Sequence, residues 1–288
     1  MSEVRQRWRL VFSRGEEARY LAHLDAVRLW ERSFRRGGIP VATSEGFSPR
    51  PKLVFAAPLQ LGMLAEHELA DLYLAERLTA PELRPRLTAG MPNGYGLVDL
   101  HDVWIGAPAI APQLAAADYR LTLLHVEPST LESATARLMS ADQLPRQRRK
   151  ETRNIPYDLR PLVIDLKVAL PEPTALPPDI DPREAAGLWM RLRHSQDSGS
   201  GRAEEVVAAL ADEMGLAVGA GAESGHAEAP AFPPEASAVS PATPEISRPA
   251  SAATDSRPAL EVVRPVRERL WLADELLSPE PASPGRAP

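Results

Sequence analysis

The order of apolar patterns along the chain limits the folds that it can adopt. Arg7 to Ser13 alternate and are rich in aromatic and β-branched side chains, which predicts a strand. Apolar residues then recur at spacings of three and four, which predicts an amphipathic helix from about His23 to Arg36. Further elements are predicted at Lys52 to Leu59 (strand), Glu68 to Ala75 (strand), Ala80 to Gly90 (helix) and Tyr95 to Val103 (strand). This is the order of a ferredoxin-like β-α-β-β-α-β unit, of class α+β.

The second half begins in the same way but is one strand short. Its predicted elements are a strand at Asp118 to His125, a helix at Pro128 to Ser140, a basic hairpin within Arg146 to Arg160, strands at Leu162 to Leu170 and Ala186 to Arg193, and a helix at Arg202 to Met214. Glu261 to Leu272 would supply the missing strand, and Pro265 would confine it to an edge or a bulge.

A Pro/Ala/Ser-rich stretch separates that last strand from the rest. Such a composition cannot bury enough apolar surface to offset its ordering entropy, so we predict disorder there. The expected organisation is two ferredoxin-like halves at 1–110 and 111–216, a disordered insertion at 217–259 that interrupts the second half, a final strand at 260–273 and a disordered tail at 274–288.

The 288 residues include no cysteine. This excludes a disulfide, a thiolate zinc site, a cysteine nucleophile and a cysteine-held iron–sulfur cluster. The six histidines are scattered, so we expect no metal and no cofactor. No apolar run approaches the roughly 20 residues that span a bilayer. The polar N-terminus lacks the apolar core of a signal peptide, so we expect a cytoplasmic protein that does not enter a membrane.

Charge is distributed unevenly along the chain. The formal net charge is -6, but Met1 to Gln60 carry eleven basic and six acidic residues. The basic surplus includes the end of the first predicted helix and the loop that follows it. The residues of interest there are Arg35, Arg36, Ser44, Gly46, Phe47, Arg50 and Lys52.

The composition of that loop is typical of a loop that binds phosphate or RNA. Gly46 permits a positive φ and close approach to a ligand, and Phe47 could stack on a base. Arg50 and Lys52 could hold phosphates. The alternative is that Phe47 packs into the core and the flanking prolines only stiffen the connection between strands.

Two other groups of residues have both a functional and a structural interpretation. His23 could act as an acid or base, although a structural role for His23 and a capping or arginine-pairing role for Asp25 are the more usual outcome. A second basic patch could contact phosphates or an acidic partner, or be a solvated turn; it comprises Arg146, Arg148, Arg149, Lys150 and Arg153.

Three motifs resemble those of the radical-SAM-linked protein family, a domain of unknown function. They are the stretch Tyr20 to Asp25, the stretch Arg35 to Pro40, and the loop Ser44 to Lys52. Glu45, Ser48 and Arg50 depart from the residues usual in that loop. The resemblance is best over Arg7 to Asp102 and extends to Met214. It implies a protein fused to, or encoded beside, a radical SAM enzyme.

The resemblance leads to three functional hypotheses. The first is a non-catalytic companion of a radical SAM enzyme that binds RNA, or presents a substrate, through the basic loop. The second is a metal-independent RNA-processing enzyme, similar in fold to the first domain of RAMP-type proteins, which would use His23 with Arg35, Arg36 or Lys52. The third is an adaptor that binds only protein.

Overall fold

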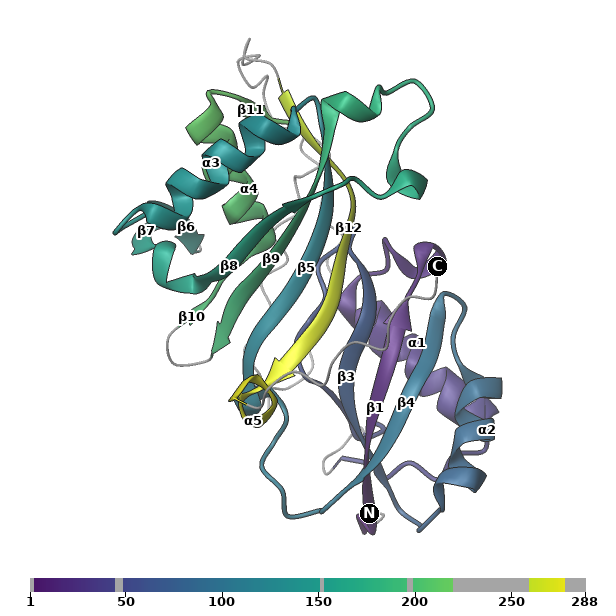
Figure 1. Cartoon of the computed structure of the whole chain (residues 1–288). Coiled ribbons are helices and arrows are strands. Elements are labelled where there is room, and N and C mark those ends of the chain that lie inside the picture. The colour runs from purple at the N-terminus through teal and green to yellow at the C-terminus, as the bar shows by residue number, and fades with distance from the viewer. Residues whose placement is uncertain (1–2, 45–48, 151–152, 196–198, 220–258, 278–288) are drawn as a thin grey trace.

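The computed structural model describes residues 3–44, 49–150, 153–195, 199–219 and 259–277 (Figure 1). The first half follows the predicted order, and both of its helices have the predicted bounds. Its elements are β1 (Gln6–Arg14), α1 (His23–Arg36), β2 (Leu53–Phe55), β3 (Leu64–Leu74), α2 (Ala80–Gly90) and β4 (Tyr95–Val103). The strands pair in the order β4-β1-β3-β2, which is the ferredoxin-like arrangement.

Local chemistry accounts for where these elements begin and end. Thr79 and Glu82 form a capping box at the start of α2. The side chain of each residue accepts a hydrogen bond from the backbone N–H of the other. Gly38 follows α1 with a φ of 59°, a conformation that glycine adopts without strain. β2 is shorter than predicted because Pro58 has no N–H to donate, and the carbonyls of Ala57 and Pro58 bind a side chain instead.

The second half repeats the same arrangement. Its elements are β5 (Leu114–Leu124), α3 (Pro128–Ser140), β6 (Pro145–Lys150), β7 (Arg153–Asp158), β8 (Val163–Ala169), β9 (Ala185–Ser195), β10 (Gly199–Ser200), α4 (Ala203–Met214), β11 (Ala217–Val218), β12 (Ala259–Leu272) and α5 (Ala273–Leu277). Its four main strands pair in the order β8-β9-β5-β12. β6 and β7 form the predicted basic hairpin, as a separate two-stranded sheet. The fold class is therefore α+β with two ferredoxin-like halves.

β12 fills the position of the missing strand. It pairs antiparallel with β5, and the pairing is interrupted between Val263 and Val266. Pro265 lies within this interruption, which is the bulge that its missing N–H predicts. Two short elements lie in segments that we predicted to be disordered: β11 pairs with the start of β12, and α5 follows its end. The remainder of the predicted insertion and tail, 220–258 and 278–288, lies outside the described residues.

β12 also joins the two halves into one sheet. Its residues Val266 to Arg269 pair in parallel with Leu64 to His67 of β3. In Figure 1 this strand, in yellow, runs between β5 and β3. The result is a ten-stranded sheet in which the last strand of the second half lies beside the third strand of the first.

Two apolar cores lie on one face of this sheet. In the first half, Phe12 of β1 packs edge-on against Trp30 of α1, with ring centroids 5.2 Å apart. In the second, alternate β5 residues pack against α3 and α4; the core there includes Leu121, Leu123, Leu131, Leu138, Val206 and Leu210. The opposite face carries arginine, aspartate and tryptophan side chains, because the period of a strand is two.

An ion pair between β12 and β3, where the two halves meet, lies on the same face of the sheet as both cores. Glu68 of β3 is opposite Phe12, and Arg267 of β12 is opposite Tyr119. Directly opposite residues share a face of the sheet. Because Arg267 and Glu68 bind each other, the helices of both halves cover the same face.

The Arg267–Glu68 pair is almost completely buried. Arg267 is 3% exposed and Glu68 is 2% exposed. Arg267 donates to both carboxylate oxygens, with Nε 2.6 Å from Oε1, and to the carbonyls of Ala57 and Pro58. The hydrogen bonds of both charges are thus satisfied, which a buried pair requires.

Removing one partner of this pair should be strongly destabilising. We expect Arg267→Met to lower the free energy of unfolding by about 3–5 kcal/mol, because it leaves Glu68 buried and uncompensated. The double variant Arg267→Met/Glu68→Leu should recover most of this loss. Arg264→Met, on the same strand but more exposed, is the control. Urea unfolding measures all three, and a single variant as stable as the control would contradict the assignment.

Candidate functional site

The predicted basic loop is anchored on the end of β3. The N–H of Ala42 donates to the carbonyl of Tyr73 at 2.8 Å, and the N–H of Tyr73 donates to the carbonyl of Lys52 at 3.1 Å. Ser44 and Arg50 close the loop, because each N–H binds an oxygen of the other residue. Backbone hydrogen bonds therefore hold the two ends of the loop to each other and to the end of β3. Gly46 and Phe47 lie outside the described residues, so their stacking and core interpretations stay predictions.

The four cations predicted around this loop are all exposed: Arg35, Arg36, Arg50 and Lys52. Arg36 donates to the hydroxyl of Ser33 at 3.2 Å within α1. None of the four forms an ion pair with another residue of the described ranges. Arg35 and Arg36 also lie in the last turn of α1, where the helix dipole favours cations.

Tyr73 connects the loop to charged residues of β1 that sequence reasoning missed. Lys52 Nζ lies 4.5 Å from the centroid of its ring, and the Arg7 guanidinium carbon lies 5.5 Å from it. Asp71, two residues away, binds Arg7 at 2.5 Å and Arg9 at 3.0 Å. We call these five residues the Tyr73 cluster. It contains three cations and one carboxylate.

Members of the Tyr73 cluster differ in their access to solvent. Arg7 is buried and also donates to the carbonyls of Ala107 and Pro108, so its role is structural. Arg9 is partly exposed and Lys52 is exposed. Burial raises the pKa of the Tyr73 hydroxyl, which stays neutral at physiological pH. The alternation of β1 already placed Arg7 and Arg9 on one face, but only the pairing with β3 shows that they meet Tyr73.

The second predicted basic patch is partly neutralised by α4. Arg148 binds Glu205 with two nitrogens, at 2.9 and 2.7 Å, and stacks on Tyr157. Arg146 pairs with Asp212 at 3.4 Å. These contacts hold the β6–β7 hairpin against the helix. Arg153 is exposed, and the side chains of Arg149 and Lys150 lie outside the described part of the chain.

His23 is half-buried at the first position of α1. Its ring meets Phe55 edge-on at 5.5 Å. Burial, and then the charge of Arg14, lower the pKa of the His23 imidazole. Asp25 pairs with Arg28 at 3.2 Å, as expected for a first-turn acid near an arginine. The described residues contain no group of three histidine, aspartate or glutamate side chains that could hold a metal ion.

Geometry separates His23 from two of its proposed catalytic partners. Arg35 and Arg36 end the helix that His23 begins. At a rise of 1.5 Å per residue, the two ends of α1 lie about 20 Å apart. His23 and these arginines therefore cannot act on one phosphate, and that combination of residues is wrong.

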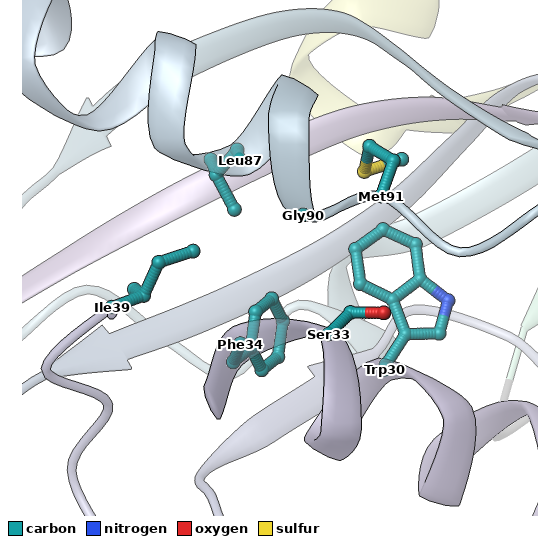
Figure 2. A pocket seen from close by; sticks show the side chains of 7 residues that line it. All are labelled: Trp30, Ser33, Phe34, Ile39, Leu87, Gly90 and Met91. Atoms are coloured by element: carbon teal, nitrogen blue, oxygen red, sulfur yellow. The ribbon is translucent and has the colours of Figure 1, made fainter. Parts of the chain in front are cut away.

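A small gap between α1 and α2 is apolar and too narrow for a water molecule. Figure 2 shows Trp30 and Phe34 rising from α1 toward Leu87 and Met91 of the facing segment. The helices approach closely here, because a Cβ on Gly90 would lie only 3.0 Å from the carbonyl oxygen of Ser33. It is a packing defect of the core and not a ligand site. No helix in the described ranges is long and apolar enough to cross a membrane.

His194 at the end of β9 should make stability depend on pH. Burial, and then the charge of Arg267, lower the pKa of its imidazole to about 4. Between pH 6.5 and 4 the unfolded chain therefore binds a proton that the folded chain does not, so stability falls as pH falls through this window. From pH 7 to 5.5 we expect a loss of about 1 kcal/mol from this residue.

Replacement of His194 tests this assignment. His194→Gln should flatten the dependence of unfolding free energy on pH between 7 and 5.5, measured by urea denaturation. His125→Gln, the same substitution at a more exposed histidine, is the control. Equal slopes for His194→Gln and the unmodified protein would contradict it.

These observations define a class: an α+β protein of two ferredoxin-like halves on one sheet, with a cation-rich cluster at the edge of the first half. The model of a family described as an uncharacterized protein conserved in bacteria (DUF2344) matches residues 7–197. The chain belongs to this family. Its description names neither an activity nor a partner.

Other comparisons add no functional information. A crystal structure of an unknown protein from Galdieria sulphuraria is similar, with 11% sequence identity and a TM-score of 0.23. The match covers 73% of this chain and 94% of that chain. A similarity this low carries no argument here. No curated protein matches the chain.

Proposed function

We propose that this chain is a non-catalytic companion of a radical SAM enzyme and that it binds RNA through the Tyr73 cluster and the adjoining loop. The observation that carries the RNA-binding part is the local charge balance. The one carboxylate of the cluster, Asp71, pairs with Arg7 and Arg9. Lys52 lies over the Tyr73 ring, and neither it nor the other exposed cations around the loop have an acidic partner among the described residues. Arg146 and Arg148 of the β6–β7 hairpin, in contrast, have such partners.

The chemistry of the cluster suits a nucleic-acid backbone. Lys52 is a compact cation that can approach a phosphate from many directions, and Arg9 offers a planar fork. The anchored base of the loop holds Lys52 and Arg50 at one sheet edge, which lowers the entropy lost on binding. A surface of this kind binds mainly through phosphates, so its affinity should fall steeply with salt.

Charge reversal in the loop should weaken RNA binding without unfolding the protein. We expect Arg50→Glu/Lys52→Glu to lower the affinity for single-stranded RNA and to reduce the log–log salt slope by about 0.7 for each phosphate that the loop no longer neutralises. Melting should change little, since exposed substitutions cost within about 0.5 kcal/mol. Fluorescence anisotropy at several salt concentrations measures affinity and slope.

The matched control for this experiment is Arg77→Glu/Arg183→Glu. It makes the same change of charge at two exposed arginines that have no ion pair in the described ranges. A loop variant that binds like this control, with an unchanged slope, would remove the loop from the site.

Support for the radical SAM partner comes from the resemblance of the three motifs and from the absence of cysteine. A chain without cysteine cannot hold an iron–sulfur cluster through thiolates, so any such cluster belongs to a partner. We expect a radical SAM protein to be encoded beside the gene for this chain, and we expect the two proteins to co-elute in size-exclusion chromatography when they are co-expressed. The loop variant should co-elute equally well, because the loop serves RNA.

Each result of the co-elution experiment has a clear meaning. If the two proteins elute separately at micromolar concentrations, the companion role is wrong. Co-elution combined with no RNA binding would favour an adaptor that binds only protein.

A second candidate is that the chain processes RNA itself. The observation in its favour is the lowered pKa of His23, which keeps the imidazole neutral at pH 7 and able to accept a proton. Incubation of the same RNA with pure protein tests it. Cleavage that disappears in His23→Ala would replace the companion hypothesis with an enzymatic one.

A further inference from the structure

One aromatic ring of the first half is open to solvent close to the Tyr73 cluster. Trp104, which directly follows β4, is 78% exposed. Among the described residues, only Trp104 and Tyr20 have aromatic rings that are more than half exposed. The Arg19 guanidinium lies over the Tyr20 ring, whereas no aromatic ring or cation of the described ranges stacks on Trp104. Packing within the described chain therefore does not explain the exposed indole.

The turn that contains Trp104 restrains its side chain. The N–H of Ala107 donates to the carbonyl of Trp104 at 2.9 Å, which closes the turn. Gly106 lies so close to the indole that a Cβ there would be only 2.6 Å from two carbons of the ring. Only glycine, which has no Cβ, permits this approach. Because one part of the ring already lies against the backbone, less side-chain entropy is lost when a ligand binds it.

Arg7 connects this turn to the Tyr73 cluster. Its Nη1 donates to the carbonyl of Ala107 at 2.6 Å, and its Nη2 donates to the carbonyl of Pro108 at 2.8 Å. The carbon of the same guanidinium lies 5.5 Å from the centroid of the Tyr73 ring. The turn that contains Trp104 is therefore attached to the face of the sheet on which the Tyr73 cluster lies.

Strand register places Trp104 and Lys52 at the two ends of a short row of residues. Arg7 pairs with Tyr73 of β3 on one side and with Val103 of β4 on the other. The N–H of Tyr73 donates to the carbonyl of Lys52. Neighbouring strands are about 4.8 Å apart, so the backbones of Val103 and Lys52 are about 14 Å apart. A nucleic-acid strand spans this distance with about four nucleotides or fewer.

We infer that Trp104 stacks on an unpaired base of an RNA strand whose phosphates bind the exposed cations around the loop. This inference rests on the proposed RNA-binding function, and it adds that the RNA is single-stranded. An indole ring can stack on any base, but the bases of a duplex are already stacked on one another. The nearest acid along the chain, Asp102, is opposite Trp8 and therefore lies on the other face of the sheet.

Two substitutions at Trp104 test the stacking role. Trp104→Ala removes the ring, and Trp104→Phe keeps an aromatic surface. We expect Trp104→Ala to bind a short single-stranded RNA about tenfold more weakly than the unmodified protein, because it loses one base stack. Trp104→Phe should retain most of the affinity. Both variants should melt close to the unmodified protein, since exposed substitutions change stability little.

Tyr20→Ala is the matched control, because it removes the other exposed aromatic ring. Tyr20 lies against Gly62, before the start of β3, whereas Tyr73 is near the end of that strand. The two places are about 30 Å apart along the strand. Tyr20→Ala should therefore bind the RNA as the unmodified protein does.

An abasic RNA of the same length separates base stacking from phosphate binding. It keeps the phosphates but offers no base, so the unmodified protein should bind it about tenfold more weakly than the intact RNA. Trp104→Ala should bind the two RNAs alike. Its log–log salt slope should equal that of the unmodified protein, because no phosphate contact is lost, whereas Arg50→Glu/Lys52→Glu should reduce the slope. Fluorescence anisotropy measures all of these affinities.

Three results would overturn the inference, and each has a different meaning. If Trp104→Ala binds the intact RNA as tightly as the unmodified protein, with the expected salt slope, the stacking role is wrong and the RNA-binding function stands. If the unmodified protein binds no RNA, both are wrong. If Trp104→Ala loses co-elution with the radical SAM protein while its affinity for RNA is unchanged, Trp104 belongs to a protein interface.

Discussion

The buried ion pair between Arg267 and Glu68 connects the two halves of this protein. It lies where β12, the last strand of the second half, runs beside β3 of the first. The arginine also binds the carbonyls at the end of β2 and lies opposite Tyr119 in the core of the second half. A buried charged pair is tolerated only when all its hydrogen bonds are made, so its geometry fixes the relative position of the halves.

Ion pairing also distinguishes structural from functional cations in this arginine-rich chain. Arg148 and Arg191 each pair with a carboxylate and stack on an aromatic ring. These contacts give both arginines a structural role. The exposed cations around the loop have no carboxylate partner among the described residues; they are Arg35, Arg36, Arg50 and Lys52. The stretch at 146–153 is also rich in basic residues, but α4 supplies acids to part of that stretch and not to the loop.

Helix α1 has charged groups at both of its ends. Its last turn carries Arg35 and Arg36, where the dipole favours cations for structural reasons alone. Its first turn has no cap, and the buried Arg14 lies beside it. The two ends are about 20 Å apart, so they cannot contact the same phosphate.

Local patterns in the sequence determined the fold class and most elements. The bounds of α1 and α2 follow from apolar spacing, the Gly37–Gly38 stop and the Thr79–Glu82 cap, all of which act within one or two turns. Pro265 even indicated the bulge in β12. Tertiary structure alone decided which charges meet. Tyr73 joins Lys52 to Arg7, Glu205 neutralises Arg148, and Arg14 lies against the start of α1, because strand register and helix docking bring together residues that are far apart in the sequence.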